Sequence, residues 1–270
     1  MSAIHISELA IYPVKSFSQI SLLKSQVDNF GLTNDRRWMV IDQNGRFITQ
    51  RQQSRMCLIK VSLIFTNLQT SAIQLSAPGM LDITVKLDST NDVTKVTVWQ
   101  DQCNALDCGS AIANWLSEFL SVQCRLVYFA DEEIRQVDST FAQKNDRTAF
   151  SDGFPILLIS QASLDALNSK LDVAIPMKRF RPNLVVSGCN AFEEDKWKLL
   201  RIGDMLLRVV KPCSRCVIPS IDTETGERGE EPTKTLLTFR RRDHKIFFGQ
   251  NVIANSTGHL AVGDTVEVLE

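Results

Sequence analysis

Short runs of β-branched and aromatic residues, separated by tight-turn residues, recur along this chain of 270 residues. In the clearest case, residues 38–42 and 46–49 flank the pair Asn44-Gly45. Asn-Gly tolerates the positive φ of tight turns, so this segment predicts a β-hairpin. Two later segments, 202–207 and 262–268, each place a Gly-Asp turn before a strand-like run. Repeated units of turn and strand indicate a barrel or a strongly curved sheet.

A few helices are expected among the strands. Ser110 can cap the first, in which apolar residues recur at helical spacing, and a second follows Ser160. Further short strands are expected at residues 61–65, 83–87, 96–98 and 184–186. The charged stretch 131–147 lies between the helices and predicts a connecting loop. We therefore place a boundary between an N-terminal segment, 1–130, and a C-terminal domain, 131–270.

Composition and charge argue against several kinds of partner. The net charge is -1 and the pI is near 6.3, and basic residues are not concentrated as in nucleic-acid-binding proteins. The chain start carries no signal-peptide pattern, and no segment has the length of a membrane span. Seven cysteines, an odd number, indicate reduced thiols. We expect a soluble, cytoplasmic protein that binds neither nucleic acid nor membrane.

The strongest chemical signal is a pair of cysteines beside an arginine, Cys213-Ser214-Arg215-Cys216. A neighbouring guanidinium favours the thiolate, which is the form of cysteine that binds soft metals. Cys216 directly follows Arg215 and is therefore the better candidate ligand.

The spacing of this pair leaves other interpretations open. A zinc site needs more ligands, yet the similar pair Cys103 and Cys108 is far upstream, and the three histidines lack ligand-like spacing. A thioredoxin-like pair needs a helix directly after its strand, whereas residues 217–221 are rich in β-branched residues and contain Pro219. Two inert buried thiols fit the spacing equally well. The role of the pair therefore has to be inferred from residues elsewhere in the chain.

Short polar motifs stand next to several predicted strands. Residues 12–16 end an N-terminal strand with an ammonium and a hydroxyl, which suit a phosphate. Two other motifs place guanidiniums and an amide ahead of strands. Each motif alone is more often a surface salt bridge or a turn, so their joint occurrence calls for one explanation. The residues concerned are Lys15, Ser16, Arg36, Arg37, Arg181 and Asn183.

Taken in order, these motifs resemble a known family, the MOSC-domain proteins that carry an N-terminal β-barrel segment. The likeness is to the branch of the mitochondrial amidoxime-reducing component and its bacterial relatives, and it runs over nearly the whole chain. It implies an α+β, β-rich fold, in which a MOSC-type β-barrel follows an N-terminal β-barrel-like segment and carries a few inserted helices. The matching segments are 12–16, 35–38, 49–52, 180–183, 213–216 and 248–251.

The resemblance implies a molybdenum enzyme whose pterin cofactor lies between the two segments. Cys216 would be the catalytic thiolate on the metal, and the dithiolene of the cofactor would supply two further sulfurs. Cys213 would lie near the site without being a ligand. Cofactor-binding roles are implied for Lys15, Ser16, Arg36, Ser151 with its neighbour Asp152, Arg181, Asn183, Arg215 and Cys216.

The implied reaction is the two-electron reduction of N-hydroxylated compounds, namely hydroxylamines, amidoximes and N-hydroxylated bases. Some bacterial relatives carry a C-terminal iron–sulfur domain, whereas no cysteine follows Cys216 here. We therefore expect a separate electron donor, a flavoprotein or a ferredoxin. Two alternatives stay open: a sulfur or molybdenum-cofactor carrier with a persulfide on Cys216, and a binding protein in which Cys213 and Cys216 are structural.

Overall fold

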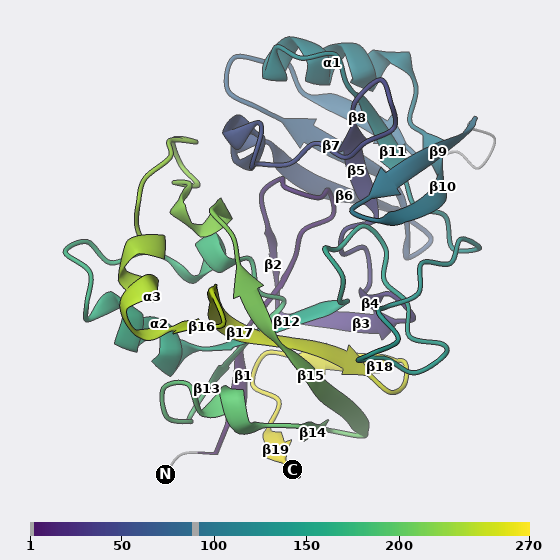
Figure 1. The fold of residues 1–270 in the computed structure, drawn as a ribbon. Coiled ribbons are helices and arrows are strands. Elements are labelled where there is room, and N and C mark those ends of the chain that lie inside the picture. Colours follow the sequence, from purple (N-terminus) through teal and green to yellow (C-terminus); the bar gives the residue numbers. More distant parts are fainter. Residues whose placement is uncertain (1–2, 88–91) are drawn as a thin grey trace.

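The fold is built mainly of strands, as Figure 1 shows. A computed structural model describes residues 3–87 and 92–270, so the first two residues of the chain start, which lacks a signal-peptide pattern, lie outside it. Within these residues the strands form one sheet of nine strands and smaller sheets of four, three and three. The predicted strand-rich α+β class is confirmed.

The nine-stranded sheet joins both ends of the chain. β1 (His5–Ile11) pairs antiparallel with β13 (Leu184–Ser187), which runs parallel to β12 (Ile156–Ser160). The predicted boundary at residue 131 stays a prediction, although strands from both sides of it share this sheet. The other strands of the nine-stranded sheet are β2 (Ile20–Leu22), β14 (Leu199–Ile202), β15 (Met205–Arg215), β16 (Arg241–Arg242), β17 (Lys245–Ala254) and β19 (Val266–Val268).

Two of the smaller sheets lie in the upper part of Figure 1, and the sheet of β3, β4 and β18 lies lower, beside the large sheet. The predicted hairpin is present: Gly45 has a φ of +74°, and Ile48 donates its backbone N–H to Val40 at 2.8 Å. The four-stranded sheet consists of β5 (Trp38–Ile41), β9 (Val93–Val98), β10 (Asp101–Asp107) and β11 (Arg125–Tyr128). One three-stranded sheet consists of β6 (Lys60–Thr66), β7 (Gln69–Ser76) and β8 (Ile83–Lys86). The other consists of β3 (Lys24–Asp28), β4 (Gly31–Leu32) and β18 (Gly258–Ala261).

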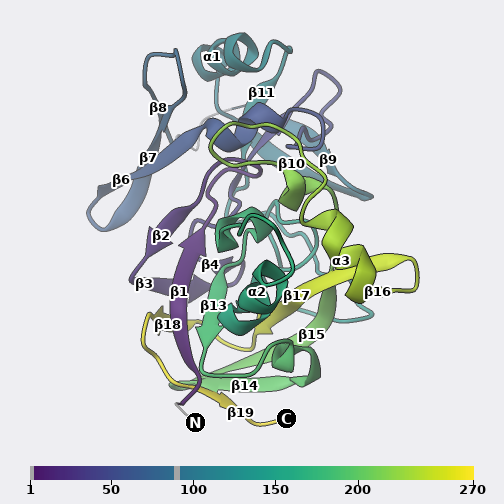
Figure 2. The ribbon, with the colours of Figure 1, turned by 90° about the vertical axis from the view of Figure 1, so that its left-hand side faces the viewer.

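Both predicted helices are present. α2 (Gln161–Asn168) follows Ser160 as predicted, and the structure adds that the Ser160 hydroxyl caps it by accepting the N–H of Ser163 at 3.1 Å. The predicted cap of α1 (Ser110–Leu120) is wrong, because Gly109, with a φ of +94°, precedes the helix and makes no side-chain cap. A third helix, α3 (Thr233–Phe239), packs beside α2 in Figure 2. Within residues 3–87 and 92–270, no helix is long and apolar enough to cross a membrane.

One segment connects the two parts of the molecule. After β1, Val14 forms a parallel bridge with Trp38 of β5, and Lys15 donates its backbone N–H to the same residue at 2.8 Å. Val14 and Trp38 are fully buried in the upper core, while Ile6 and Leu9 of β1 lie in the core of the large sheet. The chain thus crosses directly from one core into the other just before Ser16.

Candidate functional site

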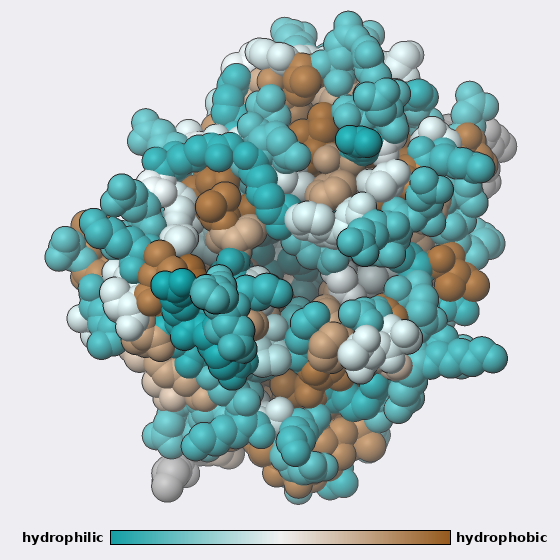
Figure 3. Space-filling view, in the orientation of Figure 1, coloured by the Kyte–Doolittle hydropathy of each residue, from teal (hydrophilic) through white to brown (hydrophobic). Residues whose placement is uncertain are grey.

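The predicted site residues line one cavity of about 450 Å³. They come from five segments: the crossing after β1, the loop before β5, the loop before β12, the link from the 3₁₀ helix η2 (Met177–Phe180) to β13, and the end of β15. The face drawn in Figure 3 is hollowed near its middle, and hydrophilic residues form much of the rim. The structure brings together all of the predicted residues, namely Lys15, Ser16, Arg36, Ser151, Arg181, Asn183, Arg215 and Cys216, and with them Asp152 and Cys213.

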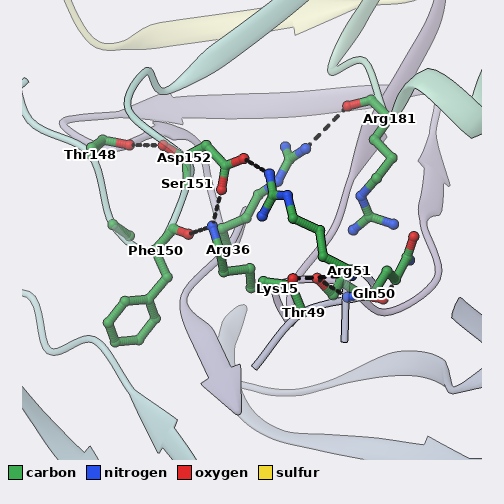
Figure 4. Close-up of polar contacts among 12 residues, drawn as sticks. Lys15, Arg36, Thr49, Gln50, Arg51, Thr148, Phe150, Ser151, Asp152 and Arg181 are labelled. Carbon is green, nitrogen blue, oxygen red and sulfur yellow. Dashed lines mark hydrogen bonds and ion pairs between the residues drawn. The ribbon is translucent and has the colours of Figure 1, made fainter. Parts of the chain in front are cut away.

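A shared carboxylate holds two cations on one wall (Figure 4). The Lys15 ammonium donates to Asp152 Oδ1 at 2.5 Å and to the Phe150 carbonyl at 2.7 Å, and Arg51 donates to Asp152 Oδ2 at 2.9 Å. Burial lowers the pKa of Lys15 to about 8. Burial by itself would raise the pKa of Asp152, but the charges of Lys15 and Arg51 outweigh it and hold that pKa well below its usual range.

Cations outnumber anions around the cavity. Asp152 is the one carboxylate among the lining residues that the structure describes. Such an excess of positive charge suits an anionic ligand, and guanidinium and ammonium groups are the usual partners of phosphate. The cationic lining residues are Lys15, Arg36, Arg51, Arg181, Lys211 and Arg215.

Two of these guanidiniums retain free donors. Arg181 follows η2 with a φ of +59°, donates Nη1 to the Phe17 carbonyl at 2.7 Å and stacks on Tyr12, 4.2 Å from the ring centroid. Burial lowers its pKa to about 10. Considering only the described residues, Arg181 Nη2 and Arg215 Nε are buried without a hydrogen-bond partner. Buried donors are normally paired, so these two fit an acceptor supplied by a ligand.

Arg36 and Asn183 brace the wall from inside the protein. Arg36 donates to Asn183 Oδ1 at 3.0 Å and to the Arg181 carbonyl at 3.1 Å. Asn183 also accepts the N–H of Leu157 at 3.1 Å and donates to the Ala10 carbonyl at 3.1 Å. Both ends of this amide are therefore engaged by the protein, and its contact with a cofactor stays a prediction.

The two serines and Arg37 also have partners within the protein. Ser16 has a φ of +72°, and its carbonyl accepts Gln50 Nε2 at 2.7 Å. Ser151 shares a 2.5 Å hydroxyl contact with Thr148. Arg37 does not line the cavity and instead donates to the Phe129 carbonyl at 2.6 Å. The serines shape the loops around the cavity, and their contact with a cofactor stays a prediction.

The thiol pair stands at the end of β15. Irregular register with β17 occurs between Val209 and Lys211 and again between Pro212 and Ser214, and such bulges re-aim side chains. The 3₁₀ helix η4 (Ile218–Ser220) follows, so the pair does not precede the long helix of a thioredoxin-like site. All seven cysteines are free, as predicted. The described residues contain no cluster of three or more His, Cys, Asp or Glu that could hold a metal ion.

The cation paired with the Cys216 sulfur is Arg51. Arg215 was expected to favour the Cys216 thiolate, but its Nη1 donates to Cys213 Sγ at 3.2 Å. Residues two apart on a strand share a face and adjacent ones do not, which explains this pairing. Burial lowers the pKa of Arg51, but the Asp152 carboxylate and the Cys216 sulfur outweigh burial and raise it above its usual value. The sequence showed Arg51 only as part of the 49–52 segment, and it gave no signal for Lys211 or Trp99.

Replacing Arg51 by Met is expected to slow alkylation of Cys216 by iodoacetamide, because a thiol loses thiolate character when its neighbouring cation is removed. Arg215→Met serves as the matched control and should slow it less, since Arg215 contacts Cys213. Mass spectrometry of the peptide that contains Cys216 gives both rates. A larger effect from Arg215→Met would contradict the assignment.

Comparison with known proteins supports the same architecture. Residues 3–123 match the MOSC N-terminal beta barrel domain, and residues 145–267 match the MOSC domain. The chain is 36% identical to the human mitochondrial amidoxime-reducing component 1 over 282 residues, which covers 98% of this chain and 82% of that protein. It is 36% identical to the rat mitochondrial amidoxime reducing component 2, with 97% and 82% covered.

These relatives correct one expectation and confirm another. The cytoplasmic location expected from the sequence is contradicted, because the human, rat and mouse relatives are all named mitochondrial components. The resemblance drawn from the ordered motifs is confirmed by both domain matches and by identity over nearly the whole chain. The chain belongs to the MOSC-domain family, in the branch of the mitochondrial amidoxime-reducing components.

Proposed function

We propose that this protein is a molybdenum-cofactor-dependent reductase of N-hydroxylated compounds. The observation that carries the proposal is the meeting of a cationic cavity with the thiol of Cys216 at its wall. An anionic pterin phosphate suits the cations, and a soft metal suits the thiolate. The relatives named amidoxime-reducing components support a reductase of this substrate class.

The residues of this chain fit such a cofactor. The unpartnered donors of Arg181 and Arg215 and the ammonium of Lys15 would hold its phosphate and its polar ring atoms. Cys216 would bind the metal as the protein's ligand. The bound cofactor would supply the two-electron redox chemistry, while the protein binds the substrate, orients it and sets the local charge. We also propose that the cofactor lies between an N-terminal segment, 1–130, and a C-terminal domain, 131–270.

The reaction breaks the N–O bond of an N-hydroxylated substrate and forms an N–H bond. Two electrons and two protons convert the hydroxylamine, amidoxime or N-hydroxylated base into the amine or amidine plus water. A separate flavoprotein or ferredoxin would deliver the electrons.

A reductase assay tests this function. The protein is purified from one host that makes molybdenum cofactor and from another that cannot, and each preparation is given benzamidoxime with reduced benzyl viologen. Only the first preparation should form benzamidine. Equal product from both preparations, or none from a preparation loaded with molybdenum, would sink the proposal.

A further inference from the structure

Trp99 is a feature of the cavity that cofactor binding leaves unexplained. Its side chain is 48% exposed, whereas the other three tryptophans, all within the described residues, are buried. It stands in the two-residue turn between β9 and β10, where Val98 pairs with Asp101, and its φ is +58°. That backbone region favours glycine, so a bulky residue there is strained, and strain of this kind concentrates at functional sites.

Neighbouring side chains fix the indole in place. Its ring lies 5.1 Å from the ring of Phe47 between centroids, at an interplanar angle of 59°. The guanidinium of Arg51 lies 4.8 Å from the indole centroid, within the range of a cation–π contact. On the inner side, the Lys15 ammonium lies 5.5 Å from the centroid of Phe47. The two aromatic side chains thus form a fixed surface next to the cationic wall.

This aromatic surface borders a second cavity of about 720 Å³. Trp99 lines both this cavity and the one that contains Cys216. The volume lies within the range of roughly 300–1,000 Å³ that small-molecule sites occupy. Side chains that can hydrogen-bond stand around the aromatic pair, among them Asp42, Gln52 and Gln53. An aromatic wall with polar groups at its edges suits a planar aryl or heteroaryl group.

Arg51 connects this groove to the thiol. The same guanidinium that stacks on Trp99 donates to Asp152 and interacts with the sulfur of Cys216. The aromatic surface therefore lies one side chain away from Cys216. A planar group stacked on Trp99 can leave a short polar substituent, such as an N–OH, pointing into the cavity of Cys216.

We propose that the groove at Trp99 is an aromatic subsite, which binds the planar aryl or nucleobase-like part of an N-hydroxylated substrate and makes the protein prefer such substrates to small aliphatic ones. The substrate class rests on the proposed function, while the binding of a planar group rests on the geometry of Trp99, Phe47 and Arg51.

Trp99→Gly tests the subsite because it removes the ring and suits the backbone conformation of the turn. Leu68→Gly is the matched control: Leu68 is also bulky, has a φ of +65° in the β6–β7 turn, is 97% exposed and lines neither cavity. Binding of benzamidoxime to the molybdenum-free protein is measured by equilibrium dialysis. Trp99→Gly should weaken it about tenfold, the equivalent of one stacked aromatic pair. Leu68→Gly should not weaken it.

In the molybdenum-loaded protein, the ratio of kcat/KM for benzamidoxime to that for acetamidoxime should fall about tenfold in Trp99→Gly. Unchanged binding and an unchanged ratio would overturn the proposal. Loss of molybdenum from Trp99→Gly would also overturn it, by assigning the indole to the cofactor. Binding that depends on Trp99 in a protein that reduces no N-hydroxylated compound would support the subsite and refute the reductase, so the two failures are distinguishable.

Discussion

Cys216→Ala is expected to lower the rate of benzamidoxime reduction to background while the protein stays folded. The substitution removes the one thiol that the ordered motifs assign to the metal, and no other side chain of the described cavity takes its place, since Arg215 engages the Cys213 sulfur. Cys216 is only half-buried, so loss of its sulfur should lower the unfolding free energy by no more than about 1 kcal/mol. Activity and chemical denaturation are measured on the same preparations.

Cys189→Ala is the control for this substitution. Cys189 is also half-buried and free, but it does not line the cavity. Its replacement should leave the rate of benzamidoxime reduction as in the unmodified protein. A Cys216→Ala protein that still reduces benzamidoxime would remove the thiol from the chemistry and leave the pair with a structural role.

The second large effect concerns the buried ammonium of Lys15. An ordinary lysine has a pKa of 10.5, whereas the pKa of Lys15 in the folded protein is about 8, because burial disfavours the charged form. Between pH 8 and 10.5 the unfolded chain therefore holds a proton that the folded chain has lost, so this group makes stability rise with pH. Relative to Lys15→Met, the unfolding free energy of the cofactor-free protein should rise by about 3 kcal/mol across that window.

An anion beside Lys15 should shrink this rise, because a negative charge supports the protonated form and returns the pKa toward its usual value. Urea unfolding at several pH values, with and without phosphate, measures both effects. Lys198→Met is the control, since the Lys198 side chain is 71% exposed and its partner is the exposed Glu270. Two results would contradict an anion site at Lys15. One is a pH-dependent rise in unfolding free energy that is as large relative to Lys198→Met as it is relative to Lys15→Met. The other is a rise relative to Lys15→Met that phosphate does not change.

Local signals in the sequence predicted local structure well. The hairpin was predictable because its turn is local: Gly45 has the positive φ, and the Asp42 carboxylate accepts the N–H groups of Asn44 and Arg46. The helix after Ser160 was predicted as well, and the structure shows that the Ser160 hydroxyl caps it. At α1 the serine was not the cap, because Gly109 already occupied the position before the helix, with a φ that only glycine adopts easily.

Contacts between distant segments could not be predicted in this way. Nothing near β1 in the sequence shows that it pairs with β13, where His5 lies opposite Ser187 and Leu9 opposite Leu184. The ordered motifs assembled the list of cavity residues, but not their partners. Adjacency predicts that Arg215 acts on Cys216, whereas Arg215 is the last residue of β15 and shares a face with Cys213. A distant loop brings Arg51 to the Cys216 sulfur instead.

The role of Trp99 could not be predicted from the sequence either. Its turn favours glycine, so neither propensity nor hydrophobic pattern marks a tryptophan there as structural or functional. Only the three-dimensional arrangement shows the half-exposed indole in contact with Phe47 and Arg51 at the junction of two cavities. Conflicts between local preference and observed structure are expected at functional sites.

The most direct test of the account is elemental analysis of the protein purified from a host that makes molybdenum cofactor, compared with Cys216→Ala prepared in the same way. A cofactor-dependent reductase with Cys216 on the metal should contain near-stoichiometric molybdenum when unmodified and much less after the substitution. Zinc in place of molybdenum, or a metal-free protein with a persulfide on Cys216, would contradict it and favour a structural site or a sulfur carrier.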